Sequence, residues 1–290
     1  MTGNVKLIRA VHSANSIFHF MEDPEFLRKA LNAKRLTPRY CKEDIGYLGI
    51  RLGEKNIEKV AVLEKCFCDI QLHSIMQPFS VERKENGESL TVSLTHPDIY
   101  GKYGLAFSKE WGIRHNLQPI HYINPASDAV SLYRDAFITA SSAEDLDNTI
   151  ADEIISRICY IKPLTGDMPR KEGEKTITYH KNFHDEREWR FVPPEKDLQA
   201  VEKGRVIFKN VINDRLNPIN TQLEDEKYKS IALNFDYDDI RYILVPDDAA
   251  RDSLLHFICR SIEFNHAGYE SELNRLISKI LVLDELGKDW

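Results

Sequence analysis

Two glutamates one residue apart, Glu186 and Glu188, are the side chains of this sequence best suited to chemistry. Read as a strand, residues 183–191 place alternate side chains on opposite faces. Glu186, Glu188 and Arg190 then share one face, and the aromatic residues of the stretch share the other. Two carboxylates beside a guanidinium can stabilise a cationic transition state, as glycosyl transfer requires. The alternative is an amphipathic strand whose polar face is a solvated ladder of Glu and Arg.

Composition limits the classes to which the chain can belong. Its 290 residues, 42% of them hydrophobic, are enough for one large domain or two small ones with a sizeable core. A net charge of −7 argues against general coating of nucleic acid, although a local basic groove is compatible with it. No apolar run approaches the roughly 20 residues that span a bilayer, and the N-terminus lacks a signal-peptide core. Five cysteines, an odd number, fit free thiols in a reducing compartment. We therefore expect a cytoplasmic protein with no membrane partner.

The order of the expected elements predicts an α+β fold. Charged runs at 82–90 and 165–174 are expected to form loops, and Asp23-Pro24 predicts the start of a short helix. A helical insertion is expected at about 126–160, and helices that cover the sheet at about 247–286. Because the strands do not alternate with helices in a βαβ rhythm, we predict a single domain over 1–290 with mixed or antiparallel sheets. Strands are expected at 17–20, 62–70, 118–123, 183–191, 204–208, 231–235 and 240–245.

Several other residues are candidates for a site. His19 lies between Phe18 and Phe20, so in a strand it points away from their shared face, as either a site histidine or a hydrogen-bonded structural histidine would. Glycines 101 and 104 flank Lys102 and Tyr103, which predicts either a ligand close to the backbone or a bulged strand. A Cys66-x-Cys68 pair without a second pair favours buried thiols, and no metal is expected.

The order of several short motifs resembles the AbiGi-type abortive phage-resistance proteins of bacteria. The resemblance runs from about residue 17 to 245. It implies an antitoxin-like member of a two-gene phage-defence system, with a cognate protein from the same operon as its partner. The motifs are Phe-His-Phe at 18–20, Cys-Phe-Cys-Asp-Ile at 66–70, His96 leading into Tyr-Gly-Lys-Tyr-Gly at 100–104, Lys-Glu-Trp-Gly-Ile at 109–113, Pro-Ile-His-Tyr-Ile at 119–123 and Glu-Arg-Glu-Trp-Arg at 186–190.

A histidine on the first strand, a helix directly after it and a late Glu-x-Glu strand also resemble ADP-ribosyltransferases, including DarT-type toxins. This second resemblance implies a two-sheet core and NAD as the substrate that donates ADP-ribose. By position, His19 would hold NAD, Glu188 would be catalytic and Glu186 would assist it. Tyr100 or Tyr103 would stack on the nicotinamide. The Ser/Thr-rich motif of the family's middle strand is replaced here by Cys66-Phe-Cys-Asp.

Asp69, the last residue of that replaced motif, is either a turn former or a polar contact for the cofactor. Two hypotheses then remain for the whole chain. The first is an NAD-dependent toxin that modifies a nucleic-acid base or a protein side chain. The second is a non-catalytic antitoxin or sensor that binds a partner protein or a nucleotide. The enzyme requires the ring of His19 and the carboxylate of Glu188 to line one pocket, and it fails if they lie on opposite sides of the sheet.

Overall fold

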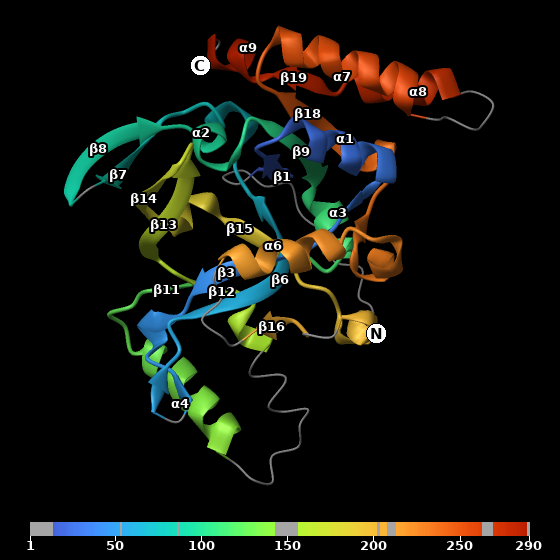
Figure 1. Cartoon of the computed structure of the whole chain (residues 1–290). Helices are drawn as coiled ribbons and strands as arrows, with labels where there is room; N and C mark the ends of the chain where they lie inside the picture. Colours follow the sequence, from blue (N-terminus) through green and yellow to red (C-terminus); the bar gives the residue numbers. More distant parts are fainter. Residues whose placement is uncertain are drawn as a thin grey trace.

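A nine-stranded sheet forms the centre of the computed structural model, which describes residues 14–52, 54–85, 87–142, 156–201, 204–207, 213–262 and 269–288 (Figure 1). Seven strands follow the order β10-β15-β6-β1-β9-β18-β19, and β3 and β16 pair with the other half of β6. All pairs are antiparallel except β18 with β19. The strands are β1 (Ser16–Met21), β3 (Arg39–Asp44), β6 (Lys59–Cys68), β9 (Tyr103–Ser108), β10 (Gln118–Pro119), β15 (Glu188–Phe191), β16 (Val206–Ile207), β18 (Ile240–Val245) and β19 (Ile280–Val282).

Each face of the central sheet is covered by its own apolar cluster. Phe67, Phe107 and Trp111 pack on one face, with α1 (Pro24–Ala33), α3 (Lys109–Arg114) and α7 (Asp248–Ser261). Phe18 and Phe20 pack on the other. Such double coverage accounts for the nearly continuous apolar sequence of β6, because its side chains are buried on both sides.

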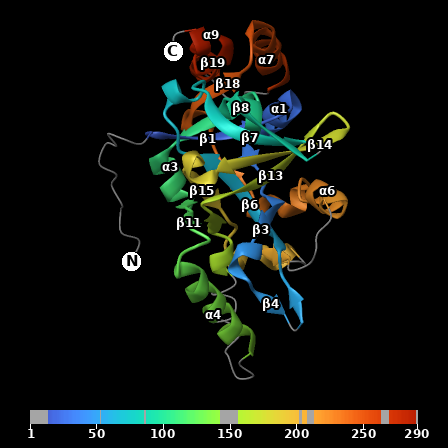
Figure 2. The same ribbon diagram turned by 90° about the vertical axis from the view of Figure 1, so that its left-hand side faces the viewer.

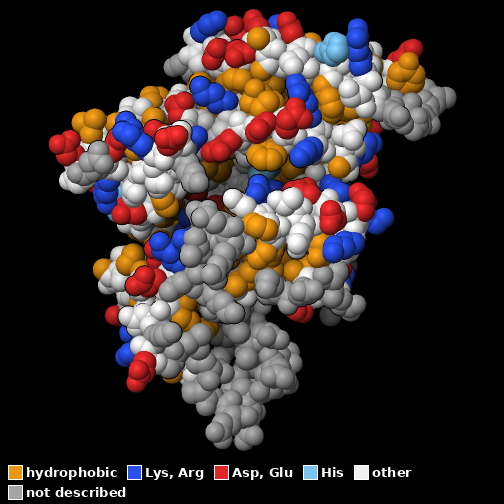
Figure 3. Space-filling model, in the orientation of Figure 1, with side chains coloured by type: hydrophobic (Ala, Val, Ile, Leu, Met, Phe, Trp, Pro, Cys, Tyr) orange, Lys and Arg blue, Asp and Glu red, His pale blue; other side chains and the backbone are white. Residues whose placement is uncertain are grey.

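A second, four-stranded antiparallel sheet lies beside the central one, in the order β13-β14-β7-β8 (Figure 2). Its strands are β7 (Phe79–Glu85), β8 (Glu88–Leu94), β13 (Thr165–Glu172) and β14 (Lys175–Asn182). The prediction of loops at 82–90 and 165–174 was therefore wrong. Val81, Ile177 and Tyr179 are buried on one face of this sheet. Glu82 and Lys84 alternate with Val81 and lie on the other face, whereas Arg83 and Glu85 share the face of Val81 toward the end of the strand, so the run has the composition of a polar loop. Charged side chains are frequent over this part of the molecule (Figure 3).

The remaining pairs and helices complete the chain. Asp23 caps α1 through a 2.8 Å bond from the Glu25 amide, and Pro24 is its first residue, as predicted. The insertion predicted at about 126–160 contains α4 (Ala129–Ser142), and residues 143–155 lie outside the described part. In residues 247–262 and 269–288, the described part of the C-terminal segment, three helices are accompanied by β19, which was not predicted. The other elements are β2 (Arg35–Leu36) with β17 (Leu233–Asn234), β4 (Arg51–Leu52) with β5 (Lys55–Asn56), β11 (His121–Ile123) with β12 (Ile161–Pro163), α2 (His96–Tyr100), α6 (Asn213–Gln222), α8 (Tyr269–Ile277) and α9 (Leu283–Lys288).

The α+β prediction is confirmed by this arrangement of sheets and helices. Within the described ranges, no helix is both long and apolar enough to cross a membrane.

Candidate functional site

The Glu-x-Glu stretch is not one continuous strand. Residues Phe183–Glu186 form a 3-10 helix, Arg187 has a left-handed backbone with φ 45°, and β15 begins only at Glu188. The alternation expected of a strand therefore does not bring Glu186 and Glu188 together. Lys162 does so instead, since its Nζ lies 3.0 Å from the Glu188 carboxylate and 3.5 Å from that of Glu186.

Both carboxylates belong to a network of buried charges that we call the ion cluster. The Arg190 guanidinium lies 2.6 Å from Glu188, 3.0 Å from Glu43 and 3.0 Å from Glu64. Lys181 lies 2.8 Å from Glu186. The seven members come from five strands and a 3-10 helix, and they are Glu43, Glu64, Glu186, Glu188, Lys162, Lys181 and Arg190.

Because the ion cluster is buried, the balance of its charges determines which of its carboxylates can ionise. Glu188 is 3% exposed and Arg190 is 0% exposed, so the predicted solvated ladder is also wrong. Burial opposes ionisation of Glu188, but Arg190 and Lys162 outweigh it and hold its pKa below the ordinary value. Burial, with Glu43 and Glu188 nearby, raises the pKa of Glu64 well above its ordinary value. Burial thus favours the protonated form of Glu64, which lessens the repulsion among the carboxylates of the ion cluster.

Tyr100 and His96 extend the ion cluster toward the four-stranded sheet. The Tyr100 hydroxyl donates to Glu186 and accepts a bond from Lys181. The Lys181 ammonium also lies 4.7 Å from the centre of the Tyr100 ring, a favourable cation–π position. His96 is 7% exposed, and neither ring nitrogen has a hydrogen-bond partner among the described residues. Burial and the Lys181 charge lower its pKa to about 4, so the ring is neutral.

His19 does not meet Glu188. Phe18 pairs with Cys68 across β1 and β6, and Cys68 pairs with Glu188 across β6 and β15. Paired residues in antiparallel strands share a face, so Glu188 shares one with Phe18, and His19 projects from the opposite face. There the His19 Nδ1 donates to the Cys66 carbonyl at 2.9 Å. Burial and the nearby Lys65 charge lower the pKa of His19 to about 3. The expected convergence of His19 with Glu188 is therefore corrected by the strand register.

Asp69 and Tyr103 also lie away from the carboxylates. Asp69 is buried and pairs with Lys109 at 2.6 Å; the Lys109 ammonium lies 5.9 Å from the Trp189 ring centre, on the face of His19. Tyr103 lines a small cavity of about 210 Å³ with Arg28 and Asp247. The structure thus brings three of the six predicted residues together, Glu186, Glu188 and Tyr100, and separates them from His19, Asp69 and Tyr103.

The two glycines around Tyr103 serve the fold of the chain. Gly101 has φ 111°, and a Cβ there would overlap the carbonyl oxygen of Met21. A Cβ at Gly104 would lie 3.3 Å from both the His19 carbonyl oxygen and the Leu244 side chain. The close approach predicted for this turn is therefore made by the protein's own backbone and core.

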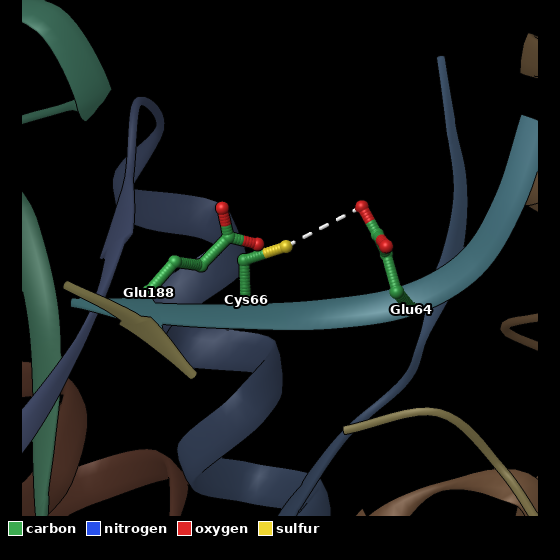
Figure 4. A group of neighbouring side chains, drawn as sticks. All are labelled: Glu64, Cys66 and Glu188. Carbon is green, nitrogen blue, oxygen red and sulfur yellow. Dashed lines mark hydrogen bonds between the residues drawn. The ribbon is translucent and has the colours of Figure 1, made fainter. Parts of the chain in front are cut away.

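Glu64, Cys66 and Glu188 form the group of side chains best able to hold a metal in the described residues, with ligand atoms within 4.8 Å of one another (Figure 4). The Cys66 Sγ lies 3.5 Å from the Glu64 carboxylate, to which it donates. A thiol binds metal as the thiolate, yet burial, with Glu188 and Glu64 nearby, raises the Cys66 pKa well above its ordinary value. Because the Arg190 cation already contacts both carboxylates, this group fits a shared proton better than a metal.

A separate pocket of about 540 Å³ lies between α4 and the loop around the 3-10 helix Gly46–Leu48. Its wall is largely apolar, with Leu48, Ile50, Phe137 and Ile161 among the lining residues. The polar side chains at the pocket are Gln118, His121, Tyr133, Arg157 and Tyr160.

Comparison with known proteins identifies the family. The family model for the abortive phage resistance protein AbiGi, which its description terms an antitoxin, matches residues 89–246. The chain is also 32% identical over 263 residues to the abortive phage resistance protein AbiGi of Lactococcus lactis subsp. cremoris, covering 87% of this chain and 98% of the relative. The chain belongs to the AbiGi family. No solved structure matches it, so the predicted ADP-ribosyltransferase fold gains no support from a structural relative.

Sequence reasoning missed several charges that define the site of this AbiGi-family chain. Lys181 continues the buried alternation of Ile177 and Tyr179 along β14. Glu64 is a lone acid in the apolar run of β6, and Lys162 stands between Ile161 and Pro163 on β12. Each of these charged residues stands at a position where the apolar pattern of the strand predicts a buried side chain, and this mismatch could have identified them from the sequence.

Proposed function

We propose that this chain acts in abortive phage resistance as a non-catalytic antitoxin, which binds a toxin encoded in the same operon. The observation that carries the proposal is the neutralisation of Glu188 by Arg190 and Lys162 within the protein. The antitoxin description of the AbiGi family model supports the same function.

The geometry explains why binding is preferred to ADP-ribosyl transfer. A catalytic carboxylate must meet the ribosyl cation as it forms, with little competition from fixed cations. One oxygen of Glu188 contacts Arg190 at 2.6 Å and the other contacts Lys162 at 3.0 Å. The histidine expected to hold NAD lies on the other face of the sheet. Transfer of ADP-ribose to nucleic acid or protein therefore stays a prediction, and direct assay decides between the two functions.

The first assay measures nicotinamide released from labelled NAD by the purified chain, alone and with total cell lysate. We expect no release above that of buffer and no label on protein or nucleic acid. Release that Glu188→Gln abolishes, in a variant with an unchanged circular dichroism spectrum, would overturn the proposal. Glu226→Gln is the matched control, because that carboxylate is 76% exposed and lies outside the ion cluster.

The second assay measures binding to the cognate protein. We expect the tagged chain to co-purify with its operon neighbour and to relieve the growth arrest that this neighbour causes in a bacterial host. Growth arrest caused by this chain alone, relieved by the neighbour, would reverse the two roles.

A second candidate, a nucleotide sensor, is favoured by the 540 Å³ pocket near α4. Its size and largely apolar wall suit a small organic ligand, and Tyr133 and Tyr160 offer rings for stacking on a base. Arg157 is exposed there and forms no ion pair in the described part of the chain, so it can meet a phosphate.

Titration calorimetry with ATP, GTP and NAD tests this second candidate. Loss of one charge-assisted contact corresponds to about 1.5–3 kcal/mol, so Arg157→Ala should weaken binding by about 10-fold or more. Arg260→Ala, at an exposed position on α7 outside the pocket, should leave it unchanged. Absence of binding by the wild type, or equal affinity in both variants, would exclude the sensor.

A further inference from the structure

Strand β8 (Glu88–Leu94) is an unprotected edge of the four-stranded sheet. Among the described strands it pairs only with β7, and Figure 1 shows it on the outer margin of the molecule. Leu90 on this strand is 64% exposed. Glu88, at the end next to the hairpin turn, is the only charged residue of its seven. An edge of this kind offers free backbone groups to another strand.

The opposite edge of the same sheet is guarded. Strand β13 carries Asp167, Arg170 and Glu172, together with Pro169 in its interior. Charges and proline are the devices by which proteins prevent pairing at an edge. The absence of such devices on β8 is therefore a property of that edge and not of the sheet as a whole.

The hairpin register shows which backbone groups of β8 face outward. Glu85 pairs with Glu88 across a connection of two residues, so this closing pair exchanges hydrogen bonds. Bonded and non-bonded pairs then alternate along the antiparallel ladder. The residues whose N–H and C=O groups point away from β7 are Ser89, Thr91 and Ser93.

These outward groups are self-complementary. If two copies of β8 lie antiparallel about a two-fold axis at Thr91, each Thr91 exchanges two hydrogen bonds with its counterpart. Ser89 of each copy then pairs with Ser93 of the other, in the bonded register that the hairpin requires. Leu90 comes to lie opposite Val92, and Glu88 opposite Leu94, so like charges do not face each other.

We propose that β8 is a homodimer interface, at which a second copy of this chain extends the four-stranded sheet to eight strands. The two-fold axis passes beside Thr91, as an isologous contact requires. The pairing satisfies the outward backbone groups of Ser89, Thr91 and Ser93 and covers the exposed Leu90. The dimer is independent of whether the chain is an antitoxin, since its test contains no partner protein.

Sedimentation equilibrium of the full chain tests the dimer. We expect the wild type to sediment at twice the mass of one chain, and Thr91→Lys to weaken the dimer by at least 10-fold, because it places like charges opposite each other. Thr91 is exposed, so the variant should keep the circular dichroism spectrum of the wild type. Thr176→Lys is the matched control, since it adds the same charge at an exposed position on the inner strand β14.

A mixing experiment identifies the axis. Thr91→Lys and Thr91→Glu should each sediment as monomers, and an equal mixture of the two should dimerise, because opposite charges then face each other. A monomeric wild type would overturn the proposal. So would a dimer that both Thr91 variants leave intact, since the interface would then lie elsewhere.

Discussion

Replacing Glu188 by Gln should destabilise the fold strongly, because the ion cluster is structural. The change removes the negative charge that lies 2.6 Å from Arg190 and 3.0 Å from Lys162, and it turns one acceptor oxygen into an NH2 group that cannot accept. The lost bond to a charged group costs about 1.5–3 kcal/mol and the buried cation left without its acceptor about 1–3 kcal/mol more, so the expected loss is about 3–6 kcal/mol. Loss of one partner of a buried ion pair typically costs about 3–5 kcal/mol, which agrees. Urea unfolding followed by circular dichroism measures the change.

A double-mutant cycle separates the ion pair from its surroundings. Arg190→Met should also be strongly destabilising, and the double variant should be less so than the sum of the two, with a coupling of about 1–3 kcal/mol. The control cycle uses Asp238→Asn and Arg275→Met, whose groups are 3.1 Å apart but exposed. There the coupling should stay below about 1 kcal/mol.

A small loss of stability would refute the structural role. If Glu188→Gln lowers the free energy of unfolding by less than about 1 kcal/mol, comparable to an exposed pair, the carboxylate is not held by its partners as the distances indicate. If the same variant then lost an NAD-dependent activity, the catalytic prediction for Glu188 would be restored.

Three further measurements follow from the described residues. The pKa values of His96 and His19 are lowered to about 4 and about 3, so the unfolded chain binds their protons first as pH falls below about 6.5. Between pH 6.5 and its lowered pKa, each histidine should therefore reduce the free energy of unfolding by about 1.4 kcal/mol per pH unit. His96→Phe should reduce the pH dependence of the free energy of unfolding, measured with urea, by the contribution of that histidine. Gly101→Ala should destabilise by more than about 2 kcal/mol, whereas Gly87→Ala, where φ is also positive but nothing lies near the new Cβ, should cost less in the same assay. Cys259 is exposed and should be the fast-reacting thiol towards a disulfide reagent in the native state, with all five reacting after unfolding.

Apolar periodicity predicted the central sheet well. The strands expected at 17–20, 62–70 and 240–245 are β1, β6 and β18. They are buried on both faces, so their sequences are almost continuously apolar and differ clearly from those of loops. Local chemistry also predicted α1, because Asp23 followed by Pro24 begins a helix through its own hydrogen bonds.

The four-stranded sheet was missed because only half of each strand is apolar. In β7 the buried Val81 is flanked by Glu82, Arg83 and Lys84, and the mean composition is that of a loop. In this sheet the backbone N–H and C=O groups of each strand are hydrogen-bonded to a neighbouring strand. Pairing between segments that are distant in the sequence, such as β7 and β14, cannot be predicted from composition. Asn86-Gly87 is the turn sequence that most often closes a hairpin, and it was the local signal available.

The candidate site was predicted in its residue types but not in its arrangement. Counting along β1 correctly placed the side chains of His19 and Phe18 on opposite faces of the sheet. The face that Glu188 occupies depends instead on the register of β15 against β6. A shift of one residue in that register would exchange the faces. The kink at Arg187 removes a further part of the expected alternation, because a left-handed residue interrupts the strand. Spacing in the sequence was therefore not enough to predict whether His19 and Glu188 share a face, or how Glu186 and Glu188 lie relative to each other.

The distinction between a structural and a catalytic carboxylate lies in where its counter-charge comes from. A catalytic Glu-x-Glu site leaves negative charge unmatched until the substrate develops a positive one, and part of its binding energy then appears only in the transition state. In this chain Lys162, Lys181 and Arg190 supply that charge permanently. A cationic transition state would compete with fixed cations at 2.6–3.0 Å, so it would gain little from Glu188. The cations that surround a Glu-x-Glu pair, more than the pair itself, decide which function the geometry supports.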